Sequence, residues 1–267
     1  MKKTALISVM ICSIILNFTA CININPGKSI EGNGILKEQD RGKMEFNVID
    51  TRGAFSIFIS DITDAPVTIS GDENLIEYIE TSVKDGVLTI KFKDEDKVYR
   101  SFTSKMGLKV TVPNNGHINS IKASGASVIT VEGIIITDNM SIMCAGSSDF
   151  NGSIVAEICN VNCAGSSNFS GNVEATTFII KCAGSSNCNM SGKADVCEIT
   201  SVGSCDFKGY DFIVNKLKCS ATGASNIQIT CNEEISVNAV GSSNVYYRGS
   251  AEVVSRKSVG SSEIVNM

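Results

Sequence analysis

Hydrophobic and polar positions repeat with a period of about 19 residues in the C-terminal half of this chain. Eight copies of one motif share a glycine, and consecutive glycines lie 18 to 21 residues apart. The clearest copies read Cys-Ala-Gly-Ser-Ser followed by Asp or Asn. A repeat of this length predicts a solenoid, in which each copy stacks on the next. The glycines are Gly125, Gly146, Gly165, Gly184, Gly203, Gly223, Gly241 and Gly260.

Two columns of the aligned repeat are suited to the interior of a coil. The residue four positions after each glycine is apolar, and burying one Phe or Ile contributes ~2 kcal/mol. The residue two positions before each glycine is small, as a narrow interior corner requires. The apolar column is Ile129, Phe150, Phe169, Cys188, Phe207, Ile227, Val245 and Ile264. The small column is Ala123, Cys144, Cys163, Cys182, Ser201, Ala221, Ala239 and Ser258.

A third column, three positions after the glycine, is polar. Ser and Asn next to a glycine favour sharp turns, and glycine adopts a positive φ without a steric penalty. Stacked Asn side chains hydrogen-bond along a ladder, so the column is either a structural turn ladder or a strip that binds glycan hydroxyls. Calcium is not expected, because calcium-binding repeats need an Asp in every copy and paired glycines. The column contains Asp149, Asn168, Asn187, Asp206, Asn226 and Asn244.

A second turn signal follows within each repeat, for example Asn151-Gly152 and Ser170-Gly171. It predicts at least two short strands per repeat, each pairing in parallel with the next repeat. Crossovers between parallel strands are right-handed. The fold class expected is therefore all-β, a right-handed parallel β-helix (β-solenoid) with ~19-residue turns over residues 116–267.

Residues 43–115 are expected to form a β-rich N-terminal part without a visible repeat. Alternating or β-branched apolar residues predict strands here. A single helical turn is expected within residues 74–81, where apolar residues alternate with acids. The predicted strands are 46–49, 55–59, 67–69, 87–92 and 108–112.

The first 20 residues have the pattern of a lipoprotein signal peptide. Lys2 and Lys3 precede an apolar run at 5–16, which is too short to span a bilayer as a helix. Small residues then precede Cys21, as in a lipobox, so lipidation is expected at Cys21 and a tether at 21–42. Several acyl chains give stable membrane anchoring. Without Lys2 and Lys3 the net charge falls from −5 to −7, which argues against a nucleic-acid partner.

The chain has 11 cysteines, and nine remain after Cys12 and Cys21 are set aside. Cys144, Cys163 and Cys182 share one column and are expected to stack. Stacked strands lie ~4.8 Å apart with parallel side chains, whereas disulfide Cβ atoms lie ~3.8 Å apart and face each other. Buried free thiols are therefore expected in this column. A bridge elsewhere, for instance at Cys219 or Cys231, stays open. No metal site is expected, because CxxC spacing is absent.

Several stretches resemble the putative auto-transporter adhesin, head GIN domain family (DUF2807), which is common in Bacteroidetes lipoproteins. The resemblance is carried by residues 67–74, 85–90, 108–113 and 240–249 and by the Ser124-Gly-Ala-Ser127 motif. Three copies depart from the family's Ser-Gly-Ala-Ser and read Cys-Ala-Gly-Ser-Ser. The resemblance implies a β-helical fold and a location outside the cytoplasm. It implies no catalytic residues and no established activity.

The function predicted is that of a non-enzymatic cell-envelope lipoprotein, a binding or structural module that adheres to glycan or matrix. One alternative is a periplasm-facing scaffold or envelope-sensing component, because no acid lies between residues 22 and 30. Another is a polysaccharide-degrading enzyme. Its candidate acids, Asp149 and Asp206, lie three repeats apart, or ~14 Å, which exceeds the separation of glycosidase carboxylates. The chain has no Trp, and its one histidine, His117, is assigned to a surface turn.

No cofactor and no catalytic residue are predicted. The membrane is the expected partner, through the N-terminal lipid. The sequence leaves open the ligand, the side of the outer membrane on which the protein lies, and the oligomeric state.

Overall fold

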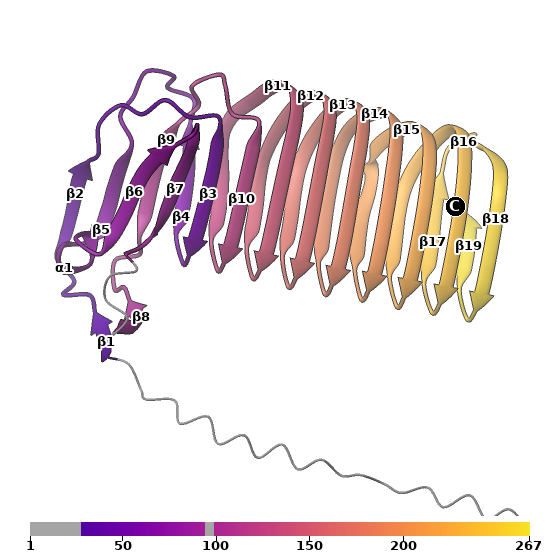
Figure 1. The fold of residues 1–267 in the computed structure, drawn as a ribbon. Coiled ribbons are helices and arrows are strands. Elements are labelled where there is room, and N and C mark those ends of the chain that lie inside the picture. Colours follow the sequence, from indigo (N-terminus) through magenta and orange to yellow (C-terminus); the bar gives the residue numbers. More distant parts are fainter. Residues whose placement is uncertain (1–27, 94–98) are drawn as a thin grey trace, which may run out of the picture.

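The computed structural model describes residues 28–93 and 99–267, which form a long β-solenoid with an N-terminal cap (Figure 1). The signal peptide and the lipidation residue Cys21 lie outside the described residues. Of the 19 strands in this part of the chain, 17 belong to one continuous sheet.

Between residues 128 and 241, each turn of the solenoid is one long strand that rises in one layer, bends, and descends in the other layer to a glycine corner (lower edge of Figure 1). Neighbouring turns pair in parallel and in register, with Gly146 opposite Gly165 and Gly165 opposite Gly184. The predicted parallel β-solenoid is confirmed. Its strands are β10 (Ser120–Gly125), β11 (Val128–Gly146), β12 (Asp149–Gly165), β13 (Asn168–Gly184), β14 (Asn187–Gly203), β15 (Asp206–Gly223), β16 (Asn226–Gly241), β17 (Asn244–Arg248), β18 (Glu252–Gly260) and β19 (Glu263–Asn266).

The prediction of two short strands per repeat was wrong for β11 to β16, each of which is one long strand; it is confirmed in the turn that follows, where β17 ends at Arg248 and β18 begins at Glu252. In β12 and β13 the second turn signal does not interrupt the hydrogen-bonded ladder, because Gly152 and Gly171 lie inside these strands and pair with each other. A strand keeps its bonds through a bend when its neighbour bends at the same place. At the upper bend the register passes over one residue on each of β11 to β15, and further shifts lie after Thr130, Asn189 and Gly209. The residues passed over are Asp138, Glu157, Thr176, Asp195 and Asn215.

The glycine corners need glycine for two reasons. Gly165 has a φ of +86°, and a Cβ at this position would lie 2.5 Å from the carbonyl oxygen of Gly146 in the preceding turn. That oxygen accepts the N–H of Ser166 at 2.8 Å, so it cannot move away without loss of the bond. The corner is also closed from within, because the Ser167 hydroxyl is buried and donates to the carbonyl of Ala164 at 3.0 Å.

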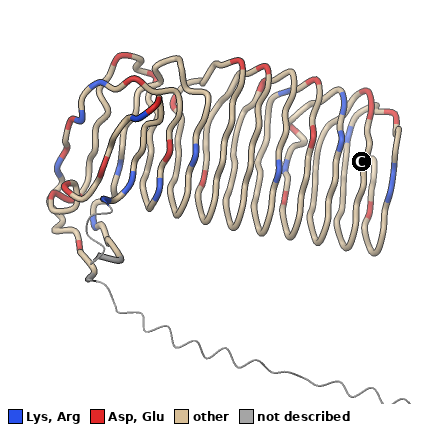
Figure 2. The backbone as a smooth tube through the Cα atoms, viewed as in Figure 1, with Lys and Arg blue, Asp and Glu red and all other residues tan. Residues whose placement is uncertain are grey.

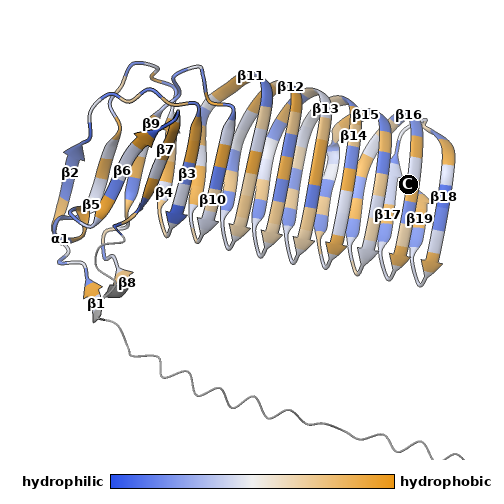
Figure 3. Ribbon diagram, viewed as in Figure 1, coloured by the Kyte–Doolittle hydropathy of each residue, from blue (hydrophilic) through white to orange (hydrophobic). Residues whose placement is uncertain are grey.

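The core lies between the two layers, and apolar bands alternate with polar ones along the strands (Figure 3). All eight members of the predicted apolar column are buried. The small column is buried from Ala123 to Ala239, whereas Ser258 in the last turn is exposed. Aromatic rings stack along the coil axis, as the 5.0 Å between the ring centroids of Phe150 and Phe169 shows. Stability therefore accumulates from turn to turn.

The solenoid begins earlier than residue 116. β3 (Val48–Gly53) pairs in parallel with β10, and β4 (Ser56–Ser60) pairs with β11. Gly53 lies opposite Gly125 and has a φ of +137°. Ile57 and Thr51 occupy the apolar and small columns and are buried. The sequence repeat does not reveal this turn, because Gly53 precedes Gly125 by 72 residues and the spacing of about 19 residues between corner glycines is interrupted.

The intervening residues fold over the N-terminal end of the coil, where β2 and β5 pair antiparallel and β7 and β9 extend the parallel layers. The predicted helical turn is present but shorter, and β6 follows it. The elements here are β5 (Thr68–Asp72), α1 (Glu73–Ile76), β6 (Ile79–Lys84), β7 (Val87–Phe92), β8 (Tyr99–Thr103) and β9 (Lys109–Pro113).

Residues 28–40, expected as part of a tether, form two strands. β1 (Lys28–Glu31) pairs with β8, and β2 (Leu36–Asp40) pairs with β5. Every residue of β2 is exposed, so the segment shows no apolar alternation in the sequence. It is a strand because it satisfies the backbone groups at the edge of β5.

Two glycine substitutions separate the backbone requirement from the steric one. Gly42 has a φ of +85°, like Gly165, but a Cβ there would meet nothing within 4 Å. Gly42→Ala is expected to cost ~1 kcal/mol, the cost of a left-handed non-glycine residue. Gly165→Ala is expected to cost ~3 kcal/mol or more, because the added methyl group also displaces a carbonyl. Chemical denaturation monitored by circular dichroism measures both, and equal losses would contradict the steric argument.

Candidate ligand-binding surface

The predicted polar column is a ladder of side-chain hydrogen bonds along the coil axis. Asn168 donates through Nδ2 to Asp149 Oδ1 at 2.7 Å, and Asn187 donates to Asn168 at 3.0 Å. Further along, Asn226 donates to Asp206 at 3.0 Å, and Asn244 donates to Asn226 at 3.3 Å. The amides therefore hold neighbouring turns together, as the structural interpretation of this column requires.

The ladder has a direction, and this explains its two acids. Each Asn donates to the preceding turn, so the first member of a run needs only to accept. Asp149 and Asp206 are these first members. Asn187 and Asp206 are in register, but a carboxylate has no proton to donate to the preceding turn. Asp149 and Asp206 thus mark the beginnings of two runs, three turns apart.

A different surface is hollowed, on the opposite edge of the coil from the glycine corners. It is called here the upper-bend groove, and its floor is Thr137, Ala156, Ala175 and Ala194. These four residues are in register on β11 to β14. Two adjoining hollows of about 600 and 420 Å³ share Val155, Ala156 and Thr176, so the groove is continuous along the axis.

The two sides of the upper-bend groove differ in chemistry. One side carries the exposed side chains of Ile136 and Ile213. Between these two residues, along the coil axis, Lys193 and Glu174 form an ion pair at 3.2 Å. The other side is formed by the residues that the register passes over, which include Asp138, Glu157 and Asp195. Acidic residues accordingly follow the upper edge of the coil in Figure 2. The groove thus offers acceptor oxygens on one side and aliphatic surface on the other.

His117 lies at the N-terminal end of the upper-bend groove and is exposed, in a surface turn as predicted. Its backbone N–H donates to the side chain of Asn115 at 3.0 Å. The groove itself was not among the features predicted from the sequence. The signal was present, because Ala156, Ala175 and Ala194 lie 19 residues apart. A column of alanines at a bend means that nothing fills the surface there.

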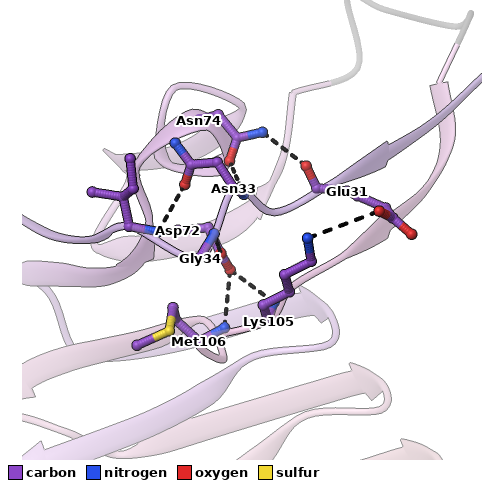
Figure 4. A network of polar contacts seen from close by, with 8 residues as sticks. Glu31, Asn33, Gly34, Asp72, Asn74, Lys105 and Met106 are labelled. Atoms are coloured by element: carbon purple, nitrogen blue, oxygen red, sulfur yellow. Dashed lines mark hydrogen bonds and ion pairs between the residues drawn. The ribbon is translucent and has the colours of Figure 1, made fainter.

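Asp72, at the N-terminal end, is the carboxylate with the strongest set of donors. Its oxygens accept hydrogen bonds from the backbone N–H groups of Gly34, Lys105 and Met106 (Figure 4). They also accept a hydrogen bond from the Ser104 hydroxyl. The hydrogen bond from Ser104, aided by those backbone bonds, lowers the pKa of Asp72 to about 2. Because its oxygens are occupied by the protein, Asp72 ties two loops, one between β1 and β2 and one between β8 and β9, to the end of β5.

Asn74 extends the Asp72 network. Its side chain accepts the N–H of Asn33 and donates to the carbonyl of Glu31, both at 2.8 Å. These bonds fix the turn between β1 and β2 against α1 (Figure 4). The network explains why the segment before residue 40 is part of the folded body.

The nine cysteines from Cys144 to Cys231 are buried and unbridged. Burial raises the pKa of both Cys159 and Cys219 to about 12, so these thiols stay protonated. Among the described residues, no three His, Cys, Asp or Glu side chains converge on a point where a metal ion would fit. The same residues include no helix with the length and apolarity needed to span a bilayer.

The chain belongs to the family described as putative auto-transporter adhesin, head GIN domain, which it matches over residues 45–251. No curated protein matches it.

Three solved structures share the fold. A putative lipid binding protein from Parabacteroides distasonis has a TM-score of 0.81 and 23% identity, and the match covers 89% of this chain and 100% of that one. A putative adhesin from the same species has a TM-score of 0.79 and 25% identity over the same shares. A putative adhesin from Parabacteroides merdae has a TM-score of 0.78 and 20% identity, with 90% and 99% covered.

The role of Asp72 is testable by its pH dependence. Its folded pKa of about 2 lies below the ordinary value, ~3.9. Its contribution to stability is therefore full above pH ~4 and is lost as the pH falls toward 2. Asp72→Asn is expected to lower the melting temperature at pH 7, and the difference from wild type should shrink steadily below pH 4. Exposed Asp211→Asn is the control, and a pH-independent difference for Asp72→Asn would refute the assignment.

Proposed function

We propose that this protein is a non-enzymatic binding module of the cell envelope, and that an extended glycan lies along the upper-bend groove. The observation that carries the proposal is the continuity of the groove over successive turns, with a floor of small residues in register. Such a surface offers the same contacts at steps of ~4.8 Å. A polymer of repeating units can use these contacts many times.

The chemistry of the two sides favours a glycan over an extended peptide. A peptide strand rises ~3.3 Å per residue and loses register with the turns within a few residues. Asp138, Glu157 and Asp195 accept hydrogen bonds from hydroxyl groups, which glycans carry on every unit. The aliphatic surface of Ile136 and Ile213 packs against the C–H faces of sugar rings.

The envelope location rests on the sequence and on the family. The lipobox-like segment before Cys21 supports anchoring to the membrane through a lipid. The family description names an adhesin, and two of the structural relatives are named putative adhesins. A role in adhesion needs the groove outside the cell, whereas a scaffold or envelope sensor would face the periplasm.

The groove assignment is tested with one exposed residue that both hollows share. Thr176→Arg places a long cation in the middle of the groove and is expected to weaken binding to the glycans bound by wild type at least tenfold, or ~1.4 kcal/mol. An array of neutral, acidic and amino-sugar glycans identifies the probe. Ser166→Arg, at an exposed glycine corner on the opposite edge, is the matched control. Equal binding by both variants would exclude the groove as the site.

The location is tested by protease treatment of intact cells that express the tagged protein, with a periplasmic protein as the internal control. A surface adhesin loses the tag while the periplasmic protein survives. If the tag is protected until the cells are lysed, the result would contradict the adhesion role and indicate a partner in the periplasm.

A further inference from the structure

The small and apolar columns face each other across the narrow core beside every glycine corner. In most turns a small residue is opposite a large one, as Cys163 is opposite Phe169 and Ser201 is opposite Phe207. The turn around Gly184 differs, because Cys182 and Cys188 occupy both positions. Their Sγ atoms lie 3.2 Å apart, and both side chains are buried.

Cys188 also interrupts the aromatic column. It follows Phe169 in register and precedes Phe207, so a small side chain separates two rings. A cysteine fills less of the core than a phenylalanine, and packing at this turn is correspondingly weaker. A covalent bond between the two layers would strengthen the coil at that point.

Cys188 has a second thiol neighbour, Cys163 of the preceding turn, so two pairings of Cys188 compete. The pair formed by Cys163 and Cys182 is less suited to a bridge. Cys163 and Cys182 are neighbours in one column, where side chains run parallel at ~4.8 Å. A disulfide needs Cβ atoms ~3.8 Å apart that face each other. Cys182 and Cys188 approach from opposite layers, and this geometry brings their sulfur atoms together.

We propose that Cys182 and Cys188 form a disulfide when the chain folds in the presence of a disulfide donor, so that this turn is a redox-modification site. The thiolate of one cysteine attacks the donor disulfide, forms a mixed disulfide and releases one donor thiol. The second cysteine then attacks the protein sulfur of the mixed disulfide and releases the second donor thiol. The two protein thiols are oxidised, their protons pass to the solvent and the donor thiols, and the donor takes up two electrons.

The reaction belongs to folding rather than to the finished structure. Hydrogen bonds with Cys163 and Cys182, together with burial, raise the pKa of Cys188. Little thiolate therefore exists once the corner has closed, and the thiolate is the reactive form. The open corner of the folding chain is where exchange occurs.

The test is refolding of the full chain, after complete reduction, in a buffer of reduced and oxidised glutathione. The product is denatured in N-ethylmaleimide and digested with trypsin, which cuts after Lys181 and Lys193. The peptide 182–193 contains Cys182 and Cys188 and no other cysteine. The expected peptide is unlabelled and lighter by two hydrogens. A peptide with two labels, or one linked to the peptide that contains Cys163, would overturn the proposal.

Two variants control the interpretation. Cys188→Phe restores the Cys–Phe pair of the two preceding turns, so the fold should persist while Cys182 takes up one label. Reductant should lower the melting temperature of the refolded wild type and leave that of Cys188→Phe unchanged. Cys163→Ala should retain the bridge, and loss of the bridge in this variant would assign the bond to Cys163 instead.

Discussion

One backbone hydrogen bond per turn sets the geometry of the whole solenoid. The carbonyl of each corner glycine accepts the N–H of the residue that follows the next glycine, as Gly146 does from Ser166 and Gly165 does from Ser185, both at 2.8 Å. The carbonyl thereby occupies the space where a Cβ of the next corner would lie. Glycine is required at the corner because of this contact between turns, in addition to its positive φ.

This contact also fixes the register of every other column. Because the corners stack without slip, residues at equal distances from a corner glycine stand above one another as far as the next register shift. The Asn side chains can then bond from turn to turn, and the alanines can form the floor of a continuous groove. A slip of one residue would reverse the inward and outward faces of a strand. The fold and its candidate binding surface therefore depend on the same bond.

Residues that obey this register were predictable, and residues that fold by other rules were not. The inward column through Phe150 and Phe169 could be predicted because each member is buried at the same position of the repeat. Gly53 obeys the same geometry, but an insertion removes the period that would reveal it. Residues 28–40 join the fold through the edge of β5 and the carboxylate of Asp72. Such contacts are made between distant segments and leave no local pattern.

The candidate binding surface was harder to predict because it is defined by small side chains. Ala156, Ala175 and Ala194 have no chemistry of their own, and they matter because the neighbouring rims rise above them. The polar column is conspicuous in the sequence because it contains Asn and Asp residues, but these side chains hydrogen-bond to one another within the protein. Along a solenoid, a conspicuous polar repeat can thus be structural while an inconspicuous apolar one shapes the surface.

In the proposed binding mode, the rims and the floor of the groove contribute differently to recognition of the ligand. The floor repeats from turn to turn, so it supplies shape at constant spacing. The rims change, from aliphatic Ile136 to the Lys193–Glu174 ion pair and back to Ile213, so they can distinguish one unit of a ligand from the next. Each turn contributes a small share of the binding energy, and the shares add only for a ligand that spans several turns. Affinity in such a groove must rise with ligand length, and selectivity must come from the rims.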